Sequence, residues 1–542
     1  MTKLTEVVTG KFSLLVATTK NQGGDPMNDK IDVLFIRTGG VDIARYGIRG
    51  TVECKLIEPM GPAYCAGYLR SKGIEASIYD MSLYPHEDRA VLYTISKQPR
   101  IVGFSILYSH MMPDSYRIIV KLRKGGYNGH ITVGGTYPTL NAEEVLRRFP
   151  AIDSVVRVEG EITSYDLLRA VNGEIKFQEV EGITYRKGKN IFSNPPRHLI
   201  TNLDDLPFPI RDDFESYVSF GGIIQIHGSR GCHANCSFCS TAAFYRKAPG
   251  KKWRVRSPKN VVDELESLLV RSFTNEVWFT DDNFIGPGKV GDDRANQIAE
   301  EIMRRGLKVK LVIQSRGDNL QRNTIKNLKQ AGLRKVYIGI ESGVNRALET
   351  FNKHMDKEKN ANALKLLEAE EVFAEMGFIG FDPFTTVEEF AENVDFLSSL
   401  CGESEYIHLF AFDMLLPYRG TPISELLLRH GKAVEHGLDY QSVIDDPRIE
   451  LAWRLTDALL IDSGPATEHI KALIIEDNSQ EEAKRCIRLK NATMIRCLMQ
   501  IRDAIFQLKI KDVSLVERHP LFDLIKNSTA ELNTALGITK QG

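Results

Sequence analysis

The stretch GGIIQIHGSRGCHANCSFCS, residues 221–240, places three cysteines directly after a short apolar run. Cys232, Cys236 and Cys239 follow the spacing C-x-x-x-C-x-x-C. Three thiolates on one loop can bind three irons of a [4Fe–4S] cluster, and the fourth iron keeps an open coordination position because no fourth cysteine is near. Zinc is a weaker alternative, since a structural zinc site needs four ligands and the spacings of His227 and His233 match neither a finger nor a ribbon. A purely structural role for the three thiols is equally disfavoured.

Outward from this loop, strand-like apolar runs alternate with helix-like stretches. The predicted strands cover residues 221–228, 276–282, 308–314, 335–341, 376–382 and 406–412, and the predicted helices cover residues 258–271, 293–305, 323–331, 345–369 and 387–399. This alternation predicts a partial (β/α)6 barrel of the TIM type over residues 221–415. The site of such a barrel lies at the carboxyl ends of its strands, where the cysteine loop begins.

An earlier series has the same alternation. Its predicted strands cover residues 31–36, 75–80, 100–106, 130–135 and 153–158, and its predicted helices cover residues 62–71, 88–96, 114–124, 142–149 and 163–170. The series predicts a doubly wound, Rossmann-like parallel sheet over residues 31–172, so the fold class is α/β. Glycines at its strand ends would let a bulky ligand approach the backbone, although any single one can serve only a turn. No G-x-G-x-x-G follows the first strand, which disfavours a dinucleotide site.

The remaining stretches divide the chain further. Residues 1–30 form an N-terminal extension, and residues 173–220 form a linker with a small predicted hairpin and the segment LDDLPFPIRDDF. After about residue 416 the strand pattern ends, and residues 416–542 are predicted to be an α-helical domain.

Composition narrows the function classes. Lys and Arg number 70 against 71 Asp and Glu, so the net charge of −1 disfavours nucleic-acid binding through bulk charge. The basic run RKAPGKKWRVR, residues 246–256, could meet RNA or an anionic substrate, but such a run is more often a solvated loop. No apolar stretch is long enough for a membrane span, and the N-terminus lacks a signal-peptide pattern, so a cytoplasmic location without membrane association is expected.

The cysteine loop, with Phe238 before its last cysteine, resembles the radical S-adenosylmethionine (SAM) enzymes. The resemblance implies a [4Fe–4S] cluster whose open iron chelates SAM, and whose electron breaks a carbon–sulfur bond to give a 5′-deoxyadenosyl radical. The SAM contacts that it implies are Phe238, Asp282, Asn283, Gln314, Ser315, Arg316, Glu341, Ser342, Ile379, Gly380 and Phe381. Arg316 and Glu341 have a simpler alternative as ion pairs on the barrel rim. The turn GFDPFTT, residues 380–386, departs from the G-x-P-G-E-T-like turn of many relatives.

The doubly wound domain ahead of such a barrel resembles the cobalamin-binding branch of that superfamily. The cobalamin contacts that this implies are Thr38, Gly39, Gly40, Ser105, Tyr108, Gly134, Gly135, Thr136, Glu159, Gly160 and Glu161. The motif D-x-H-x-x-G is absent after the first strand, and neither His86 nor His110 satisfies it. The lower face of cobalt is therefore expected to lack a histidine ligand.

By resemblance, the chain is a cobalamin-dependent radical SAM methyltransferase of a natural-product (antibiotic) pathway. It would methylate an unactivated carbon or phosphorus of a small molecule through the 5′-deoxyadenosyl radical and methylcobalamin, with an electron donor such as flavodoxin or ferredoxin. The C-terminal helices, including Trp453, and the turn at residues 417–422 are expected to help enclose the substrate. Two alternatives stay open: an oxidative cyclase or rearrangement enzyme without methyl transfer, and a non-catalytic cobalamin-binding sensor, which the intact cysteines disfavour.

Overall fold

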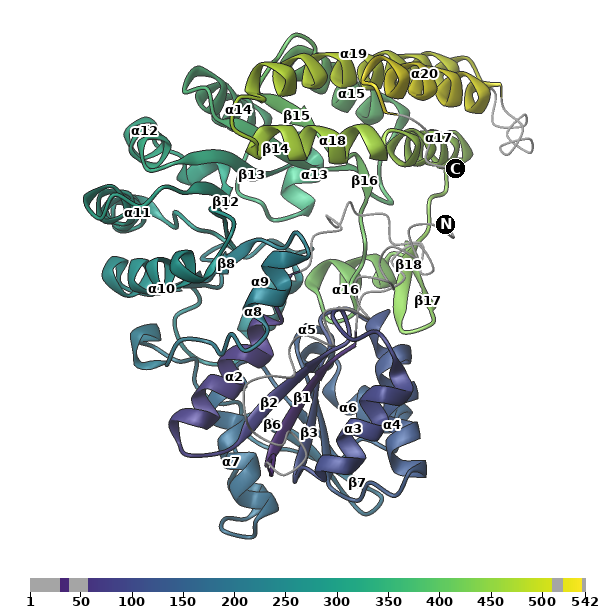
Figure 1. The fold of residues 1–542 in the computed structure, drawn as a ribbon. Helices are drawn as coiled ribbons and strands as arrows, with labels where there is room; N and C mark the ends of the chain where they lie inside the picture. Colours follow the sequence, from purple (N-terminus) through teal and green to yellow (C-terminus); the bar gives the residue numbers. More distant parts are fainter. Residues whose placement is uncertain (1–29, 39–56, 509–519, 539–542) are drawn as a thin grey trace.

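The computed structural model describes residues 30–38, 57–508 and 520–538. Figure 1 shows two α/β domains, with the N-terminal one in the lower part of the view and the second above it. The first contains a seven-stranded sheet in the order β2-β1-β3-β4-β5-β6-β7. Its first five strands are parallel and confirm the predicted series: β1 (Val33–Arg37), β2 (Ala76–Asp80), β3 (Ile101–Ser105), β4 (His130–Gly134) and β5 (Ser154–Val156). The predicted hairpin, β6 (Ile183–Lys187) and β7 (Asn190–Ser193), extends this sheet past residue 172 as antiparallel strands.

Helices cover both faces of the first sheet because its strands are apolar on both faces. Val33 and Phe35 of β1 pack in the core that includes α2 (Met60–Ser71) and α7 (Glu161–Val171). Leu34 and Ile36 pack in the opposite core, with α3 (Glu87–Lys97), α4 (Met111–Lys124) and α6 (Ala142–Arg148). Burial on both faces is typical of a central parallel strand, so the domain is doubly wound.

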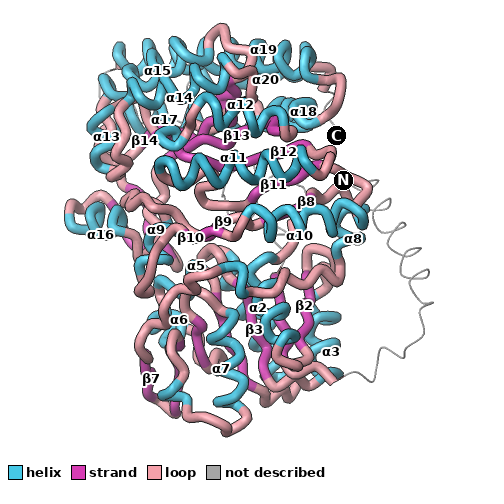
Figure 2. The backbone as a smooth tube through the Cα atoms, turned by 90° about the vertical axis from the view of Figure 1, so that its left-hand side faces the viewer, coloured by secondary structure: helices cyan, strands magenta, loops and turns pink. Residues whose placement is uncertain are grey.

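The second domain is the predicted partial barrel, an open sheet of parallel strands. Its order is β15-β14-β13-β12-β11-β8, and β16 also pairs with β14. The strands are β8 (Ile224–Ile226), β11 (Glu276–Phe279), β12 (Lys310–Arg316), β13 (Leu333–Glu341), β14 (Phe373–Phe381), β15 (Ile407–Leu409) and β16 (Asp413–Met414). Figure 2 shows α10 (Pro258–Arg271), α11 (Gly288–Arg304) and α12 (Arg322–Gln330) along the outer face of this sheet.

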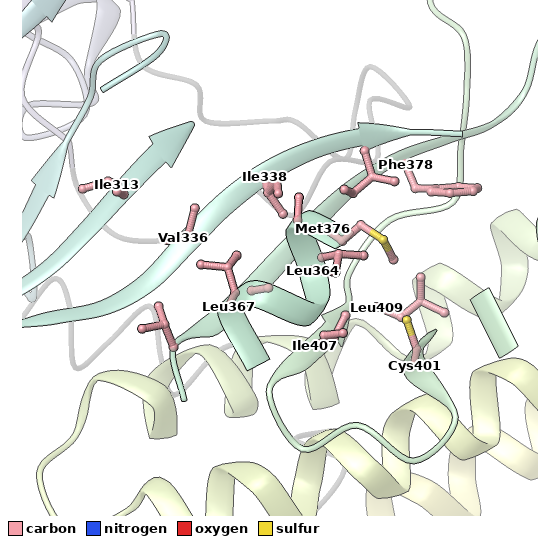
Figure 3. Packing of buried hydrophobic residues seen from close by; sticks show 14 of the residues in the cluster. Ile313, Val336, Ile338, Leu364, Leu367, Met376, Phe378, Cys401, Ile407 and Leu409 are labelled. Atoms are coloured by element: carbon pink, nitrogen blue, oxygen red, sulfur yellow. The ribbon is translucent and has the colours of Figure 1, made fainter. Parts of the chain in front are cut away.

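The core of the barrel lies between these strands and the outer helices. In Figure 3, Ile313, Val336, Ile338 and Met376 of the strands pack with Leu364 and Leu367 of α14 (Lys357–Ala369). The helix predicted over residues 345–369 is wrong as a single element, because α13 (Asn345–Thr350) ends before α14 begins. Asn352 and His354 between them have positive φ angles of 49° and 56°, which a continuous helix does not allow.

The C-terminal region is mainly helical but contains a hairpin, so the prediction that strands end at about residue 416 is wrong. The hairpin β17 (Ala433–His436) and β18 (Asp439–Ser442) follows α16 (Pro422–Arg429). It contacts the first domain, where Arg148 donates a 3.0 Å hydrogen bond to the Gly437 carbonyl. The helices α17 (Pro447–Asp462), α18 (Gly464–Ile475), α19 (Gln480–Gln507) and α20 (Leu521–Ala535) lie across the far side of the barrel. None of the helices described in the chain is long and apolar enough to cross a membrane.

Candidate active site between the two domains

The cysteine loop runs from β9 (Ser229–Arg230) to α9 (Ser240–Arg246), and the end of β11 anchors it at both sides. The Asp282 carboxylate accepts hydrogen bonds from the Gly231 N–H (3.0 Å) and the Thr241 hydroxyl (3.1 Å). Gly231 has a φ of 76°, and a Cβ atom there would lie 2.1 Å from the Lys252 carbonyl oxygen, so the turn needs glycine. Burial, opposed by these hydrogen bonds, raises the pKa of Asp282 to about 6.

The three thiols fit an iron–sulfur cluster better than a single ion. Burial raises the pKa of the Cys239 thiol to about 11, and the charges of Asp282, Cys236 and Cys232 add to it, so the three thiols are close neighbours. Across the described ranges, no three His, Cys, Asp or Glu side chains are arranged to hold one metal ion. A cubane takes each thiolate on a different iron, which this spacing allows. Arg316 Nη1 also lies 3.4 Å from Cys236 Sγ, where it would stabilise a thiolate.

Some of the predicted SAM residues organise the rim through mutual contacts. Asn283 Oδ1 accepts hydrogen bonds from the Arg316 N–H (3.2 Å) and the Ser315 hydroxyl (3.3 Å). Ser342 pairs with Asn393 at 3.1 Å. These side chains are buried, so they fix the positions of neighbouring strand ends.

The ion pairs that were the simpler alternative for Arg316 and Glu341 are present in the structure. Glu341, which has a φ of 67°, accepts a 2.8 Å hydrogen bond from Lys353. Lys353 lies in the break between α13 and α14. Arg316 pairs with Asp318 at 2.8 Å. Gln314 is half-buried on β12.

The aromatic and apolar residues among the predicted SAM contacts pack against other side chains of the barrel domain. Phe238 meets Phe351 edge-to-face at 5.4 Å. Phe381 is fully buried against Phe412, and Ile379 is half-buried on the same strand. A Cβ atom on Gly380 would lie 1.9 Å from the Phe412 ring, so this position admits only glycine.

The first domain presents its strand ends to the cysteine loop. Gly135 has a φ of 103°, and a Cβ atom there would lie 2.4 Å from the Ile106 carbonyl oxygen. Thr136 then begins α5 (Thr136–Leu140), which packs against α9. Ser105 and Gly134 are paired at the ends of β3 and β4. Thr38 shares a 2.9 Å hydrogen bond with Ser115, whereas Gly39 and Gly40 lie outside the described residues.

Glu159 and Glu161 tie the first domain to the barrel. Glu159 accepts from Arg230 (3.1 Å) and Arg254 (2.7 Å), and Glu161 accepts from Arg230 (2.6 Å). Gly160 between them lies against Cys65, whose sulfur would be 2.8 Å from an added Cβ.

The basic run at residues 246–256 is therefore not a uniformly solvated loop. Trp253, Arg254 and Arg256 are buried, and Arg256 donates to the His227 carbonyl at 3.0 Å. Lys247 and Lys251 stay exposed, because only the second half of the run faces the first domain.

Tyr108 shows that the two rims face each other. Tyr108 is 43% exposed. Partial burial is the largest cause of its raised pKa, and the charges of Asp282 and Cys239 of the barrel add to it, so the phenol lies near both groups. The Tyr418 ring, from the turn at residues 417–422, lies 6.1 Å away. That turn does border the site. Trp453 instead packs against the barrel core from α17, which corrects the expectation that it encloses substrate.

Two further residues, Asp413 at this rim and Tyr337 near it, were not among the predicted site residues. Asp413 follows the predicted strand 406–412 by one residue, and Tyr337 lies within the predicted strand 335–341. A polar residue just past a barrel strand is the signal that would have found Asp413. Tyr337 offered no signal beyond its alternation with buried Val336 and Ile338.

Comparison with known proteins gives the same two domains. The B12 binding domain matches residues 54–168, and the Radical SAM superfamily matches residues 226–397. An uncharacterized methyltransferase of Pyrococcus horikoshii is 30% identical over 373 residues, which cover 68% of this chain and 78% of the relative. The anaerobic magnesium-protoporphyrin IX monomethyl ester cyclase of Cereibacter sphaeroides is 31% identical over 350 residues, which cover 61% of this chain and 55% of that enzyme.

A solved structure shares the whole fold. The cobalamin-dependent S-adenosylmethionine radical enzyme OxsB, with aqua-cobalamin and S-adenosylmethionine bound, aligns with a TM-score of 0.76. It covers 94% of this chain and 82% of its own, at 18% identity. The two matched domains follow each other in the predicted order, and the three thiols lie on the barrel loop that the resemblance implied. This chain belongs to the cobalamin-dependent, methyltransferase-like radical SAM enzymes, and its cofactors are cobalamin, S-adenosylmethionine and a [4Fe–4S] cluster.

Proposed function

We propose that this enzyme transfers a methyl group to an unactivated carbon or phosphorus centre of a small natural-product intermediate. The observation that carries the proposal is the opposition of the two strand-end rims, with Tyr108 near Asp282 and Cys239 and α5 against α9. When bound, the cofactors supply the radical and the methyl group, chemistry that no side chain provides. The protein positions the substrate between them and excludes water.

The side chains divide this work by domain. Cys232, Cys236 and Cys239 would hold the cluster, and the rim residues from Asp282 to Phe381 named above would surround SAM. The strand ends of the first domain, from Thr38 to Glu161, would surround cobalamin. Gly135 supports this assignment because it brings backbone, not a side chain, to the rim.

A one-electron donor such as flavodoxin or ferredoxin would reduce the cluster. Nucleic acid is not part of the proposal. The buried arginines of the run at residues 246–256 pair with Glu159 and Glu264, so they are not free to bind phosphates.

The test is anaerobic reconstitution of the cluster with hydroxocobalamin, reduction, and mass spectrometry of the SAM products. The wild type is expected to form both 5′-deoxyadenosine and methylcobalamin. Cys236→Ala is expected to lose 5′-deoxyadenosine, because a cluster ligand is gone. Cys497→Ala, which removes a thiol buried on α19, is the matched control and is expected to form both products.

A second candidate is an oxidative cyclase or rearrangement without methyl transfer. The named cyclase among the relatives favours it, since its identity to this chain equals that of the methyltransferase relative within one per cent. Formation of 5′-deoxyadenosine without methylcobalamin would support this candidate. Neither product, with both cofactors bound, would point to the non-catalytic sensor.

A further inference from the structure

Asp413 lies at the carboxyl edge of the barrel, where the proposed reaction takes place. It follows buried Phe412 and sits opposite Ile379 of β14 in the sheet. The side chain is half-buried. Within the described parts of the chain, no side chain or backbone N–H donates a hydrogen bond to its carboxylate, and no cation lies near enough to lower its pKa.

Other carboxylates on the same edge all have partners. Asp282 accepts from Gly231 and Thr241, Glu341 pairs with Lys353 at 2.8 Å, and Asp382 pairs with Arg346 at 2.9 Å. Burial raises the pKa of Asp413 to about 7, with no opposing contribution. A half-buried carboxylate that no described side chain or backbone N–H pairs with is available to a ligand that supplies a donor, and its place at a strand end puts it where such a barrel binds its ligands.

The groups facing Asp413 are aromatic and neutral. Burial raises the pKa values of Tyr337 of β13 and Tyr418 of the turn, and the charge of Asp413 adds to both shifts, so both phenols are near it. The charges of Glu341, Glu375 and Tyr108 also contribute to the raised pKa of Tyr337. Tyrosine rings attract cations, and the further acidic and phenolic groups bring no positive charge close to Asp413.

Exposed apolar side chains lie close along the chain to both Tyr108 and Tyr418. Leu107, next to Tyr108, is 48% exposed, and Leu416, two residues before Tyr418, is 50% exposed. A ligand at Asp413 would therefore meet tyrosine rings and one carboxylate. That combination suits an organic cation and disfavours an anion.

We propose that Asp413 binds a protonated nitrogen of the substrate, so that the substrate is a small organic amine. The proposal rests on the proposed function only in taking this space as the substrate site. SAM itself carries an ammonium and a sulfonium, which share this chemistry. The experiment therefore measures the cofactor and the amine separately.

The probes are n-hexylammonium and its neutral match 1-hexanol, with binding to the cluster- and cobalamin-loaded protein followed by saturation-transfer NMR. At pH 8 hexylammonium is expected to bind at least tenfold tighter than hexanol. Because only ionised Asp413 pairs with the cation, its affinity is expected to fall roughly tenfold from pH 8 to pH 6, around the pKa of about 7. Asp413→Asn is expected to remove both the preference and the pH dependence, whereas Asp395→Asn, at an exposed position of α15 (Val387–Cys401), keeps them.

Equilibrium dialysis of SAM supplies the second arm. SAM affinity is expected to be unchanged in Asp413→Asn. Weaker SAM binding with unaltered amine binding would assign the carboxylate to the cofactor and overturn the proposal. A wild type without a pH-dependent preference for the ammonium would overturn it without any variant. These outcomes need no turnover, so failure to form 5′-deoxyadenosine would count against the proposed function alone.

Discussion

Glu161 and Arg230 form one of the buried ion pairs that join the two domains. Their side chains are 4% and 11% exposed, and the Arg230 guanidinium also lies 4.7 Å from the centre of the Tyr64 ring. Removing one member of such a pair leaves the other charge buried without a partner. The expected loss in the free energy of unfolding is about 3 kcal/mol or more.

We expect Glu161→Gln to lower the midpoint of thermal unfolding by roughly 3 °C, given the unfolding entropy of a chain of this size. Differential scanning calorimetry measures the shift. Glu174→Gln is the control, since Glu174 is 52% exposed and pairs with Arg169 at 3.4 Å, and its midpoint should not move. An unchanged midpoint in Glu161→Gln with weaker cobalamin binding would assign the carboxylate to the cofactor instead.

The two kinds of site residue differ in how far the sequence could predict them. The cysteines were recognisable because they bind from one short loop with a fixed spacing. The pair Arg230 and Glu161 was not, because its members are 69 positions apart and only the packing of two domains brings them together. Asp413 is an intermediate case, since its place after a strand was visible but its lack of a partner was not.

At the scale of elements, both alternating series were predicted because their strands are short apolar runs between helix-like stretches, buried on both faces in the first sheet and on alternate positions in most of the barrel. The hairpin β17–β18 was missed because it lies at the surface, and Val434 is 51% exposed. Without a buried face, a strand shows no hydrophobic alternation. The break between α13 and α14 was missed because helix-forming residues flank it, while the left-handed backbone at Asn352 and His354 depends on tertiary contacts.

Helix α19 completes the barrel at its open edge. Lys490 donates a 2.6 Å hydrogen bond to the Leu409 carbonyl, and Asn491 accepts from the Leu409 N–H at 3.1 Å and donates to the Ile407 carbonyl at 2.7 Å. These bonds satisfy backbone groups of β15 that no further strand pairs. Side chains of a helix thus replace the missing strands of a closed barrel.

The position of Lys490 predicts a pH dependence of stability. Burial, with a contribution from Lys471, lowers the pKa of Lys490 to about 7 in the folded protein, against 10.5 ordinarily. Between these values the unfolded chain binds the extra proton, so stability rises with pH and the burial penalty is full below about pH 7. From pH 7 to pH 9 the gain from this group is about 2 kcal/mol.

Lys490→Met removes this titration. The difference in unfolding free energy between variant and wild type, measured by urea denaturation, should therefore shift by that amount against the variant as pH rises from 7 to 9. Lys526→Met, at an exposed position of α20, is the control and should show a constant difference. A constant difference for Lys490→Met as well would mean that Lys490 stays protonated in the fold.

At the scale of the whole molecule, the proposed cofactor site lies between the two domains, so an electron donor has to reach the cluster loop from the outer surface. Helix α9 starts directly after Cys239, and seven residues of helix, about 10 Å, separate that start from its end at Arg246. Lys247 and Lys251 beyond it are exposed, and no acid in the described ranges pairs with either. This basic surface is the one nearest the cluster loop along the chain, and it suits a carrier of opposite charge.

We expect Lys247→Glu with Lys251→Glu to slow 5′-deoxyadenosine formation at least tenfold when a negatively charged flavodoxin supplies electrons, because charge reversal opposes the encounter. The same variant should match the wild type with dithionite, a small reductant that needs no docking surface. Added salt should narrow the flavodoxin difference, since the Debye length shortens from about 10 Å at 0.1 M to 3 Å at 1 M. The control is Lys187→Glu with Lys189→Glu at the exposed β6–β7 turn, which Figure 1 shows in the lower part of the first domain, away from α9. Equal loss with both reductants would mean that the substitutions damage the cluster loop, and no loss with flavodoxin would place the entry of electrons on another face.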